Sequence, residues 1–397
     1  MEWKEVRLGD VCSELSDGLH KAPKFIEKGE YIFVNAKNLY NGYILDNDPT
    51  KKTSHEEYLK YKKPLGKHTI LYSIDGTIGN IAKYRGEKCV LGKGACYLNC
   101  NPKIVESSYL YYQLQSPHFK SYIHLMSTGS TIKHISLKTM REYVFELPSL
   151  TDQRRIASIL SSLDRKIELN NKINADLEEM AQAIFKNWFV DFEPFKDGKF
   201  VDSELGMIPE GWKVGSPYEY VKVVYGAPYK SAKFNDNGEG LPLIRIRDLK
   251  DCNPQFYTPE ILPQTEYVNK GDIIAGMDAE FVPHIWKGNT GLLNQRVCKL
   301  MPQRTSISNL FVLHLMKPEL EFVQSYKTGT TVSHLGKADI DKFVVVLPPL
   351  EVVEDCSKIL DSILQRIKKI SAQSRTLSLL RDTLLPRLMS GEIEVPE

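Results

Sequence analysis

The stretch that decides the fold is TGSTIKHISLKTMREYVFELPSL at residues 128–150, because it returns as TGTTVSHLGKADIDKFVVVLPPL at residues 328–350. Seven residues recur two hundred positions later: Thr128, Gly129, Thr131, His134, Leu147, Pro148 and Leu150. Agreement at one fixed spacing marks an internal repeat. The sequence therefore predicts two copies of one structural unit.

The repeat extends upstream of this stretch, with offsets slightly above two hundred that indicate loops of different length. The aligned pairs are Trp3-Lys4 with Trp212-Lys213, Lys24-Phe25 with Lys233-Phe234, YIFVNAKNL at 31–39 with LPLIRIRDL at 241–249, and GKHTILYSIDG at 66–76 with GDIIAGMDAE at 271–280. Most of both halves is therefore covered by the duplication.

Apolar residues recur in alternating steps of four and three after each Leu-Pro-x-Leu sequence, as in the seam of a coiled coil. The first seam contains Ile156, Leu160, Leu163, Ile167, Asn170, Asn174, Leu177, Ala181, Ile184 and Trp188. The second contains Cys356, Leu360, Ile363, Ile367, Ile370, Ser374, Leu377, Arg381, Leu384 and Leu388. This spacing predicts two long helices.

Each helix would run for roughly 35 residues, about 50 Å at 1.5 Å per residue, and would extend beyond a domain of about 150 residues. A single apolar stripe is otherwise typical of a helix packed on its own domain. Because each helix matches the other in length, we expect them to pack together, with polar seam residues that fix their register. Those residues are Asn170, Asn174, Ser374 and Arg381.

The segments outside the helices combine short apolar runs with Gly and Pro turns, which is typical of α/β-mixed globular domains. Expected strands include Tyr31–Val34, Thr69–Ser73, Val90–Cys100 and Leu243–Ile246, and short helices are expected near Ser107–Leu114 and Ser308–Met316. The predicted order is a first globular domain at 1–150, a long helix at 151–190, a linker at 191–207, a second globular domain at 208–350 and a second long helix at 351–390. The predicted fold class is therefore α+β.

At 397 residues the chain is too long for a single domain. A hydrophobic content of 42% excludes wholesale disorder and a fibrous repeat. With 52 Lys and Arg against 50 Asp and Glu, any nucleic-acid surface needs local segregation of charge. No apolar stretch approaches a membrane span and the start lacks a signal-peptide core, so we expect a cytosolic protein. The seven scattered cysteines are expected to be reduced, with Cys89, Cys96 and Cys100 buried rather than bound to zinc.

No motif in the sequence supports catalysis by this chain. An adenine methyltransferase would carry an Asn/Asp-Pro-Pro-aromatic tetrapeptide, which is absent from the sequence. The segment GEKCVLGKG at 86–94 differs from a phosphate loop in its spacing and its last residue, so we interpret it as a turn.

Two further groups could suggest chemistry. Asp278, Glu280 and Lys287 resemble a nuclease cluster, but the first copy offers only Asp75 there, so hydrogen-bonding or loop roles are preferred. The Ser and Thr residues near His134 and His334 form no nucleophilic triad, and we interpret both histidines as capping or core residues. We therefore predict no catalytic residue and no metal site.

Binding to nucleic acid fits the residues better. Six lysines against two glutamates, with tyrosines between them, give the segment 51–67 a local net charge of +4 that suits phosphate contact. They are Lys51, Lys52, Lys60, Lys62, Lys63 and Lys67, with Glu56 and Glu57. A solvated lysine-rich loop is an equally good interpretation of this segment.

Different polar residues follow an equivalent strand in each copy. The first copy has Asn35, Lys37 and Asn38, and the second has Arg245, Arg247 and Asp248. Arginine and asparagine contact the edges of guanine and adenine with two hydrogen bonds. This divergence predicts two modules that read different sequences.

The combination closely resembles the specificity subunits of Type I restriction-modification enzymes over the full chain. The features that carry the resemblance are PEGWK at 209–213, TGSTIKH at 128–134 with TGTTVSH at 328–334, Leu-Pro-x-Leu followed by QRRIASILSSLDRKIELN at 153–170, GMDAEF at 276–281 and LLNQRV at 292–297. The second helix is less typical, with VVEDCSKILDS at 352–362 where the first has QRRIASILSS.

The resemblance implies two target-recognition domains, each reading one half of a split DNA site. It also implies an antiparallel coiled coil of the two helices and a pseudo-twofold axis. Members of this family have no catalysis or cofactor of their own. They bind double-stranded DNA and two methyltransferase subunits, which use S-adenosylmethionine to methylate adenine, and the full complex adds ATP-dependent translocase-nuclease restriction subunits. A membrane partner is not expected.

The predicted DNA-contacting residues are basic and polar side chains of the repeated segments and the lysine-rich segment. They are Lys24, Asn35, Lys37, Asn38, Lys62, Lys63, Thr128, Ser130, Thr131, Lys133, Lys230, Lys233, Arg245, Arg247, Thr330 and Thr331. The alternative from another class is a fused or self-sufficient DNA nuclease or methyltransferase. A coiled-coil scaffold without a DNA role is a third interpretation, and it predicts no basic grooves.

Overall fold

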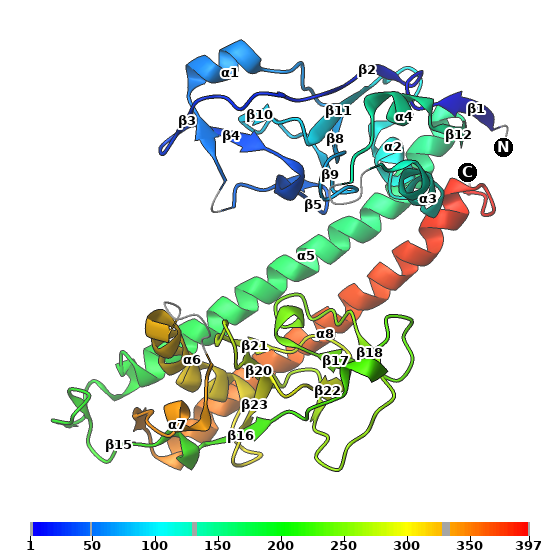
Figure 1. The fold of residues 1–397 in the computed structure, drawn as a ribbon. Coiled ribbons are helices and arrows are strands. Elements are labelled where there is room, and N and C mark those ends of the chain that lie inside the picture. The colour runs from blue at the N-terminus through cyan, green and yellow to red at the C-terminus, as the bar shows by residue number, and fades with distance from the viewer. Residues whose placement is uncertain (1–2, 48–49, 129–132, 328–333, 396–397) are drawn as a thin grey trace. The chain divides into compact units, whose positions relative to one another are not determined.

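The computed structural model of the chain describes residues 3–47, 50–128, 133–327 and 334–395. The chain forms two compact units (Figure 1). The first unit consists of residues 1–167 together with residues 376–397, and the second consists of residues 168–375. Each predicted long helix is therefore shared between the units, whereas the sequence suggested helices separate from the domains.

The first unit contains short strands and short helices. The strands are β1 (Lys4–Arg7), β2 (Cys12–Asp17), β3 (Phe25–Ile26), β4 (Tyr31–Val34), β5 (Leu39–Tyr40), β6 (Tyr43–Ile44), β7 (Lys52–Thr53), β8 (Thr69–Ser73), β9 (Ile81–Lys83), β10 (Cys89–Leu91), β11 (Ala95–Cys100) and β12 (Val144–Leu147). The helices are η1 (Ala36–Asn38), α1 (His55–Tyr61), α2 (Ser107–Gln113), α3 (Pro117–Met126) and α4 (Leu137–Glu142).

The second unit is built from comparable elements. Its strands are β13 (Phe200–Val201), β14 (Ile208–Pro209), β15 (Lys213–Gly215), β16 (Val221–Tyr225), β17 (Leu241–Ile244), β18 (Tyr257–Thr258), β19 (Tyr267–Val268), β20 (Ile273–Gly276), β21 (Pro283–Ile285), β22 (Gly291–Leu293), β23 (Val297–Pro302) and β24 (Val345–Leu347). Its helices are η2 (Glu193–Phe195), η3 (Pro217–Glu219), η4 (Ser231–Lys233), η5 (Ile246–Asp248), α6 (Asn309–Lys327) and α7 (Lys337–Ile340). The long helices are α5 (Leu150–Phe189) and α8 (Leu350–Met389).

Three sheets of the first unit have a counterpart in the second unit within the described residues. An antiparallel sheet β2-β11-β8-β9 in the first unit matches β16-β23-β20-β21 in the second. A second sheet contains a parallel pair, β10 with β4 in the first unit and β17 with β22 in the second. The pairs β1-β12 and β15-β24 also match. The predicted internal repeat is confirmed.

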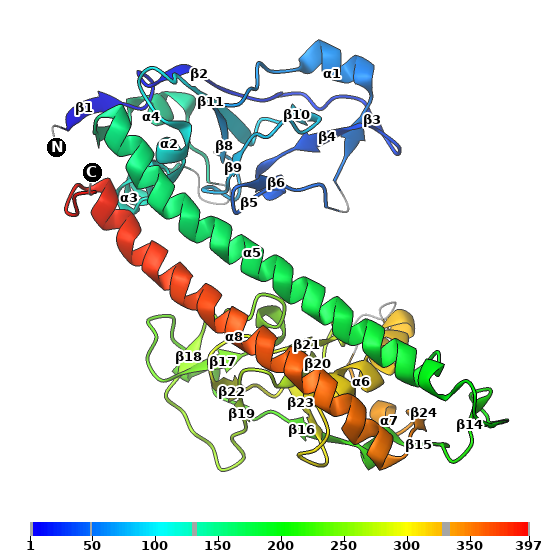
Figure 2. The ribbon, with the colours of Figure 1, turned by 180° about the vertical axis from the view of Figure 1, so that it is seen from behind.

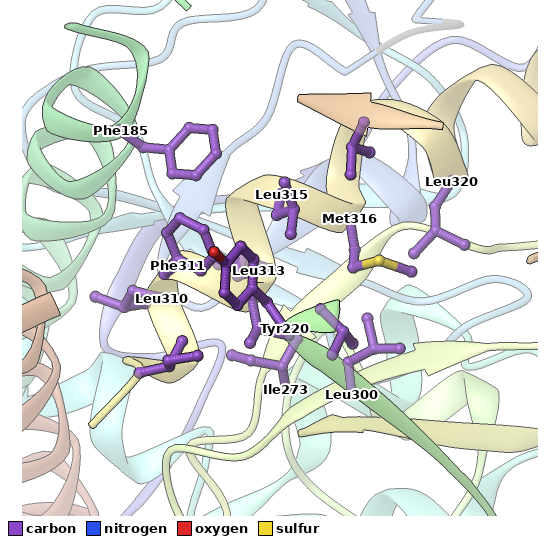
Figure 3. Packing of buried hydrophobic residues seen from close by; sticks show 14 of the residues in the cluster. Phe185, Tyr220, Ile273, Leu300, Leu310, Phe311, Leu313, Leu315, Met316 and Leu320 are labelled. Carbon is purple, nitrogen blue, oxygen red and sulfur yellow. The ribbon is translucent and has the colours of Figure 1, made fainter. Parts of the chain in front are cut away.

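The central strands are apolar along their whole length because both of their faces are covered. All five residues of β8 and all four residues of β20 are buried. In the second unit, Phe311 of α6 lies at the centre of the main core and contacts Phe185 and Tyr220, with ring centroids 5.6 and 5.9 Å apart (Figure 3). Each such buried ring stabilises the unit by about 2–3 kcal/mol.

The long helices pack against each other within each unit. In the first unit, Ile156 and Leu160 near the start of α5 share a core with Leu388 near the end of α8. In the second unit, Phe185 near the end of α5 shares a core with Val353 near the start of α8. The start of α5 packs against the end of α8 in the first unit, and the end of α5 packs against the start of α8 in the second unit. The two helices therefore run antiparallel (Figures 1 and 2). The predicted pairing of the helices is confirmed.

Polar residues interrupt the apolar seam as predicted. In the second unit, Asn170 Nδ2 donates to Gln373 Oε1 at 3.0 Å and Asn174 Nδ2 donates to Ser371 Oγ at 3.1 Å. In the first unit, Arg381 Nη1 donates to Asp164 Oδ1 at 2.9 Å. Because a buried amide without a partner costs free energy, these bonds favour one register of the two helices. The hydroxyl of Ser374, by contrast, is buried without a partner among the described residues.

Two predicted strands differ from the structure. The stretch 90–100 forms two strands, β10 and β11, because residues 92–94 turn between them and Lys93 N donates to Leu19 O at 2.9 Å. The stretch 243–246 belongs to a strand only up to Ile244, because Asp248 accepts the Arg245 N–H at 2.9 Å and closes the 3-10 turn η5.

The predicted linker at 191–207 is folded. Its strand β13 pairs with β14, and Phe192 and Phe195 pack on Trp212 with ring centroids 5.3 and 5.1 Å apart. These aromatic residues join the main core of the second unit, which explains why the segment is ordered.

The remaining expectations concern cysteines and membranes. Cys89, Cys96 and Cys100 are buried, as expected for small apolar side chains. Within the described ranges, every helix is too short or too polar to cross a bilayer.

Candidate nucleic-acid interface

The loop between α3 and α4 is closed at its base by backbone hydrogen bonds. Thr128 and His134 exchange bonds of 3.0 and 2.9 Å, and Ile135 N donates to Ile74 O at 2.9 Å just beyond β8. In the second unit, Leu335 N donates to Met277 O at 2.7 Å just beyond β20. Ile135 and Leu335, which follow the two repeated histidines, are therefore attached to the ends of equivalent central strands, β8 and β20.

An aspartate and a histidine meet at this attachment in both units. In the second unit, His334 Nδ1 lies 2.7 Å from Asp278 Oδ1, within hydrogen-bond distance. In the first unit, His134 Nδ1 lies 3.7 Å from Asp75 Oδ1, which is longer than a hydrogen bond. Both histidines are partly exposed, so they are not the capping or core residues that we predicted. They face a carboxylate instead, and the Nδ1 atom of His134 is buried without a hydrogen-bond partner among the described residues.

In each unit the aspartate that faces the histidine also faces a basic side chain. Arg296 Nη1 lies 2.8 Å from Asp278 Oδ2, and Lys93 Nζ lies 4.0 Å from Asp75 Oδ2. Arg296 and Lys93 occupy the corresponding connections β22–β23 and β10–β11. Each unit therefore holds a histidine and a cation around one aspartate, more tightly in the second unit.

The polar turns η1 and η5 adjoin this arrangement. A side chain at Gly92 would overlap Asn35 Oδ1, and a Cβ at Gly94 would lie 3.7 Å from both the Ala36 N and the Asp75 Cβ atoms. In the second unit, Asn294 N donates to Ile244 O at 3.2 Å, which ties the β22–β23 connection to the strand before η5.

We call the surface formed in each unit the recognition edge. In the first unit it comprises Asn35, Lys37, Asp75, Lys93, Thr128, Lys133 and His134, and in the second unit it comprises Arg245, Arg247, Asp278, Arg296 and His334. Of the predicted contacts, Asn35, Lys37, Thr128, Lys133, Arg245 and Arg247 are on these edges. The other predicted contacts are discussed below.

The two arginines of the second edge differ in their surroundings. Arg247 is exposed, whereas the guanidinium of Arg245 lies over the Phe256 ring at 4.2 Å and its side chain is 19% exposed. Burial lowers the pKa of Arg245, although Asp248 opposes this shift. Its Nε and Nη2 atoms are buried without an acceptor among the described residues. Arg247 is therefore the more accessible group for a base or phosphate.

Asn38 stabilises the turn, contrary to its prediction as a DNA contact. Its side chain is buried, its Oδ1 accepts the Asn35 N–H at 3.0 Å, and its Nδ2 donates to Leu45 O and Thr50 Oγ1 at 3.1 and 3.0 Å. Asp248 has the same position in the second unit and the same capping bond. The polar group is needed in both copies because it fixes the backbone.

The lysine-rich segment lies away from the recognition edge. Lys62 and Lys63 precede β8, and Asn99 Nδ2 donates to Pro64 O at 2.9 Å near the start of that strand. Asp75 follows the other end of β8, about 15 Å away at 3.3 Å per residue. Asp46 pairs with Lys52 at 2.8 Å, so the local charge is smaller than the sequence suggested.

Three other predicted lysines, Lys24, Lys230 and Lys233, have a glutamate partner for their backbone N–H or their side chain. Lys24 N donates to Glu57 Oε2 and Lys230 N donates to Glu260 Oε2, both at 2.9 Å. Lys233 Nζ lies 2.9 Å from Glu260 Oε1. Ser130, Thr131, Thr330 and Thr331 lie outside the described residues.

The Asp–His arrangement was missed from the sequence although both partners are visible there. His134 and His334 repeat at an offset of 200, whereas Asp75 and Asp278 repeat at 203. The sequence alignment matched Asp75 with Asp278 and His134 with His334 as separate pairs. Only the folded structure brings each aspartate next to its histidine.

Comparison with known proteins identifies the family. The Type I restriction modification DNA specificity domain matches residues 1–179 and 209–376. The chain is 28% identical to the Type I restriction enzyme MjaIX specificity subunit of Methanocaldococcus jannaschii, over all of this chain and 94% of that protein. It is 23% identical to the HindI specificity subunit of Haemophilus influenzae, over 99% of this chain and all of that protein.

A solved structure has a similar fold. The S subunit of a Type I restriction-modification system from M. genitalium aligns with a TM-score of 0.55 and 17% identity, covering 98% of this chain and 96% of that chain. The family domain matches in two copies that coincide with the two repeats of sheets. The chain belongs to the family of Type I restriction-modification DNA specificity subunits.

Proposed function

We propose that this chain reads a split DNA site, with each recognition edge contacting one half of it. The observation that carries the proposal is a repeated frame with different polar residues on it. The Asp75–His134 and Asp278–His334 pairs are common to both units, whereas Asn35 and Lys37 in one unit correspond to Arg245 and Arg247 in the other. Arginine suits guanine and asparagine suits adenine, so the two edges would prefer different bases.

The chain would act by binding, without catalysis or a cofactor of its own. The residues that suggested a nuclease cluster are engaged in separate ion pairs: Asp278 with His334 and Arg296, Glu280 with His284 at 3.5 Å, and Lys287 with Glu178. Because Asp278 and Glu280 have separate cationic partners, these two carboxylates do not form a group that could hold a metal. This disfavours the alternative of a self-sufficient nuclease.

We infer that the DNA-bound chain recruits two methyltransferase subunits, and restriction subunits through the complex. The duplication supports the number two, because two equivalent units offer two equivalent surfaces to one kind of partner. Since its partners act on cellular DNA, the complex would work in the cytosol. Target choice would then belong to this chain and chemistry to its partners.

Exchange of one half tests the proposal. Residues 1–150 are replaced by those of a relative, and the sites methylated by the reconstituted complex are mapped by sequencing. We expect one half of the methylated site to change and the other to stay the same. A change in both halves would contradict modular reading. The chain without methyltransferase, incubated with labelled S-adenosylmethionine and DNA, should transfer no methyl group.

A further inference from the structure

A cavity of about 620 Å³ lies in the first unit at the opposite end of β8 from the recognition edge. Its lining includes Lys67, His68, Lys83, Arg85, Ser107 and Ser108. Glu106 also lines it, with a carboxylate that accepts the Ser108 N–H at 3.3 Å. The cavity therefore combines cationic side chains with two hydroxyl groups, and its volume lies within the range of ligand pockets.

Lys83 is the most enclosed of these cations. Its Nζ atom lies over the rings of Tyr111 and Tyr112, at 4.4 and 5.5 Å from their centroids, and 3.3 Å from Ser108 Oγ. Among the described residues, no carboxylate comes within ion-pair distance of it. Burial lowers the pKa of Lys83 to about 8, and the nearby Arg85 adds to this shift, whereas the carboxylates of Asp164 and Glu106 oppose it. An anion in the cavity would offset that cost.

Arg85 is held in place beside Lys83. Its Nη1 atom donates to Gly42 O at 2.6 Å and to Lys83 O at 3.1 Å, and its guanidinium lies over the Tyr43 ring at 4.1 Å. A guanidinium fixed in this way loses little entropy when it binds an oxyanion.

The corresponding corner of the second unit carries different side chains. Strand pairing places Ile285 where the first unit has Lys83, since they pair with Ile273 and Ile70 respectively. Lys287, the counterpart of Arg85, forms an ion pair with Glu178. Gly271 replaces His68, and a Cβ there would lie only 2.9 Å from Lys368 Cδ. The pair formed by Lys83 and Arg85 is therefore specific to the first unit, although the second unit also has cations at this corner, where Lys368 and Arg375 influence Lys270.

We propose that this cavity binds a phosphate group through Lys83 and Arg85, with Ser107 and Ser108 as further donors. Two cations match the charge of a phosphate, and a guanidinium with hydroxyl groups matches its several oxygens. The phosphate comes either from a free nucleotide or polyphosphate or from the backbone of bound DNA. Binding of the free ligand is independent of the split-site function proposed above.

The first test is calorimetric titration of the full chain with pyrophosphate and with ATP. We expect Lys83→Met and Arg85→Gln to weaken binding at least tenfold, with partial recovery in Arg85→Lys. Lys103→Met is the matched control, because it removes one exposed lysine of the same unit outside the cavity. Thermal melting verifies that each variant is folded, and Arg85→Gln carries the test should Lys83→Met fail to fold.

The second test distinguishes the source of the phosphate. DNA affinity is measured between 50 and 300 mM salt for the same variants. A backbone phosphate in the cavity lowers the salt slope of Lys83→Met by about 0.9 relative to Lys103→Met. A free ligand leaves that slope unchanged while pyrophosphate or ATP still binds. The proposal is overturned if the slopes coincide and, in addition, either neither ligand binds or all variants bind pyrophosphate and ATP equally.

Discussion

Asp278→Ala should weaken discrimination at one half of the DNA site only. Asp278 accepts contacts from His334 at 2.7 Å and Arg296 at 2.8 Å, and its side chain is 24% exposed. Hydrogen bonds to charged groups contribute about 1.5–3 kcal/mol when buried, and exposed ion pairs contribute about 0.2–1 kcal/mol. For a partly exposed pair of contacts we expect a loss of about 1–2 kcal/mol, or roughly five- to thirtyfold in discrimination.

The same change in the first unit should have a smaller effect. Asp75 lies 3.7 Å from His134 and 4.0 Å from Lys93, beyond hydrogen-bond distance for both. We expect Asp75→Ala to cost less than about 1 kcal/mol, which is below fivefold. The two variants therefore differ in which half-site they affect and in the size of the effect.

The assay measures affinity by fluorescence anisotropy for the cognate duplex and for duplexes altered in one half-site. The quantity to compare is discrimination, the ratio of the affinity for the cognate duplex to that for an altered duplex. Affinity alone is unsuitable because removal of a carboxylate strengthens binding to any DNA. Asp236→Ala, which removes an exposed carboxylate of the second unit, is the matched control. If Asp278→Ala reduces discrimination equally in both half-sites, or in neither, the Asp–His–Arg arrangement does not position the reading residues.

Three further predictions follow from other features. Arg247→Ala should cost about 1–3 kcal/mol at one base pair of the second half-site in a panel of mutated duplexes, whereas uniform weakening would mark a phosphate contact. Burial lowers the pKa of His314 to about 4 from 6.5, so its contribution to stability is complete above pH 6.5 and is lost towards pH 4. Urea unfolding at pH 7 and 4.5 should therefore show that His314→Leu loses about 2–3 kcal/mol less on acidification than the parent chain. Four residues inserted after Ala175 would lengthen α5 by about 6 Å with a rotation of about 400°, so the methylated sites should show a spacer longer by one or two base pairs and unchanged half-sites. An unchanged spacer, with the insertion shown to be helical, would mean that the helices do not set it.

The helices could be predicted because their signal is local. A residue of the seam can be identified from the apolar residues three and four positions away, so this spacing predicts that Ile156 and Leu160 are buried, as they are in the structure. The partner helix followed from the repeat. The polar seam residues Asn170 and Asn174 were also visible in this way, but their partners Gln373 and Ser371 were not, because sequence spacing does not give the rotation of one helix against the other.

The recognition edge was only partly predictable because its residues come from distant segments. Asn35 and Lys37 were found from the strand that precedes them, whereas Asp75 and His134 meet although they are 59 positions apart in the chain. Lys62 and Lys63 looked like part of the same basic surface, yet β8 separates them from it. Asn38 shows the same difficulty at short range, because an asparagine that caps a turn and one that reads a base look alike in sequence.

The division of the chain into units has a consequence for biosynthesis. The second unit is one continuous segment, residues 168–375, inserted between the two parts of the first. The apolar cluster of the first unit includes Leu388, Met389 and Val395, so it stays incomplete until the ribosome has released those residues. The second unit thus has all of its residues before the first, although its synthesis begins later. Until then the apolar cluster that contains Ile156 and Leu160 lacks these three side chains, which leaves the nascent chain more prone to aggregation.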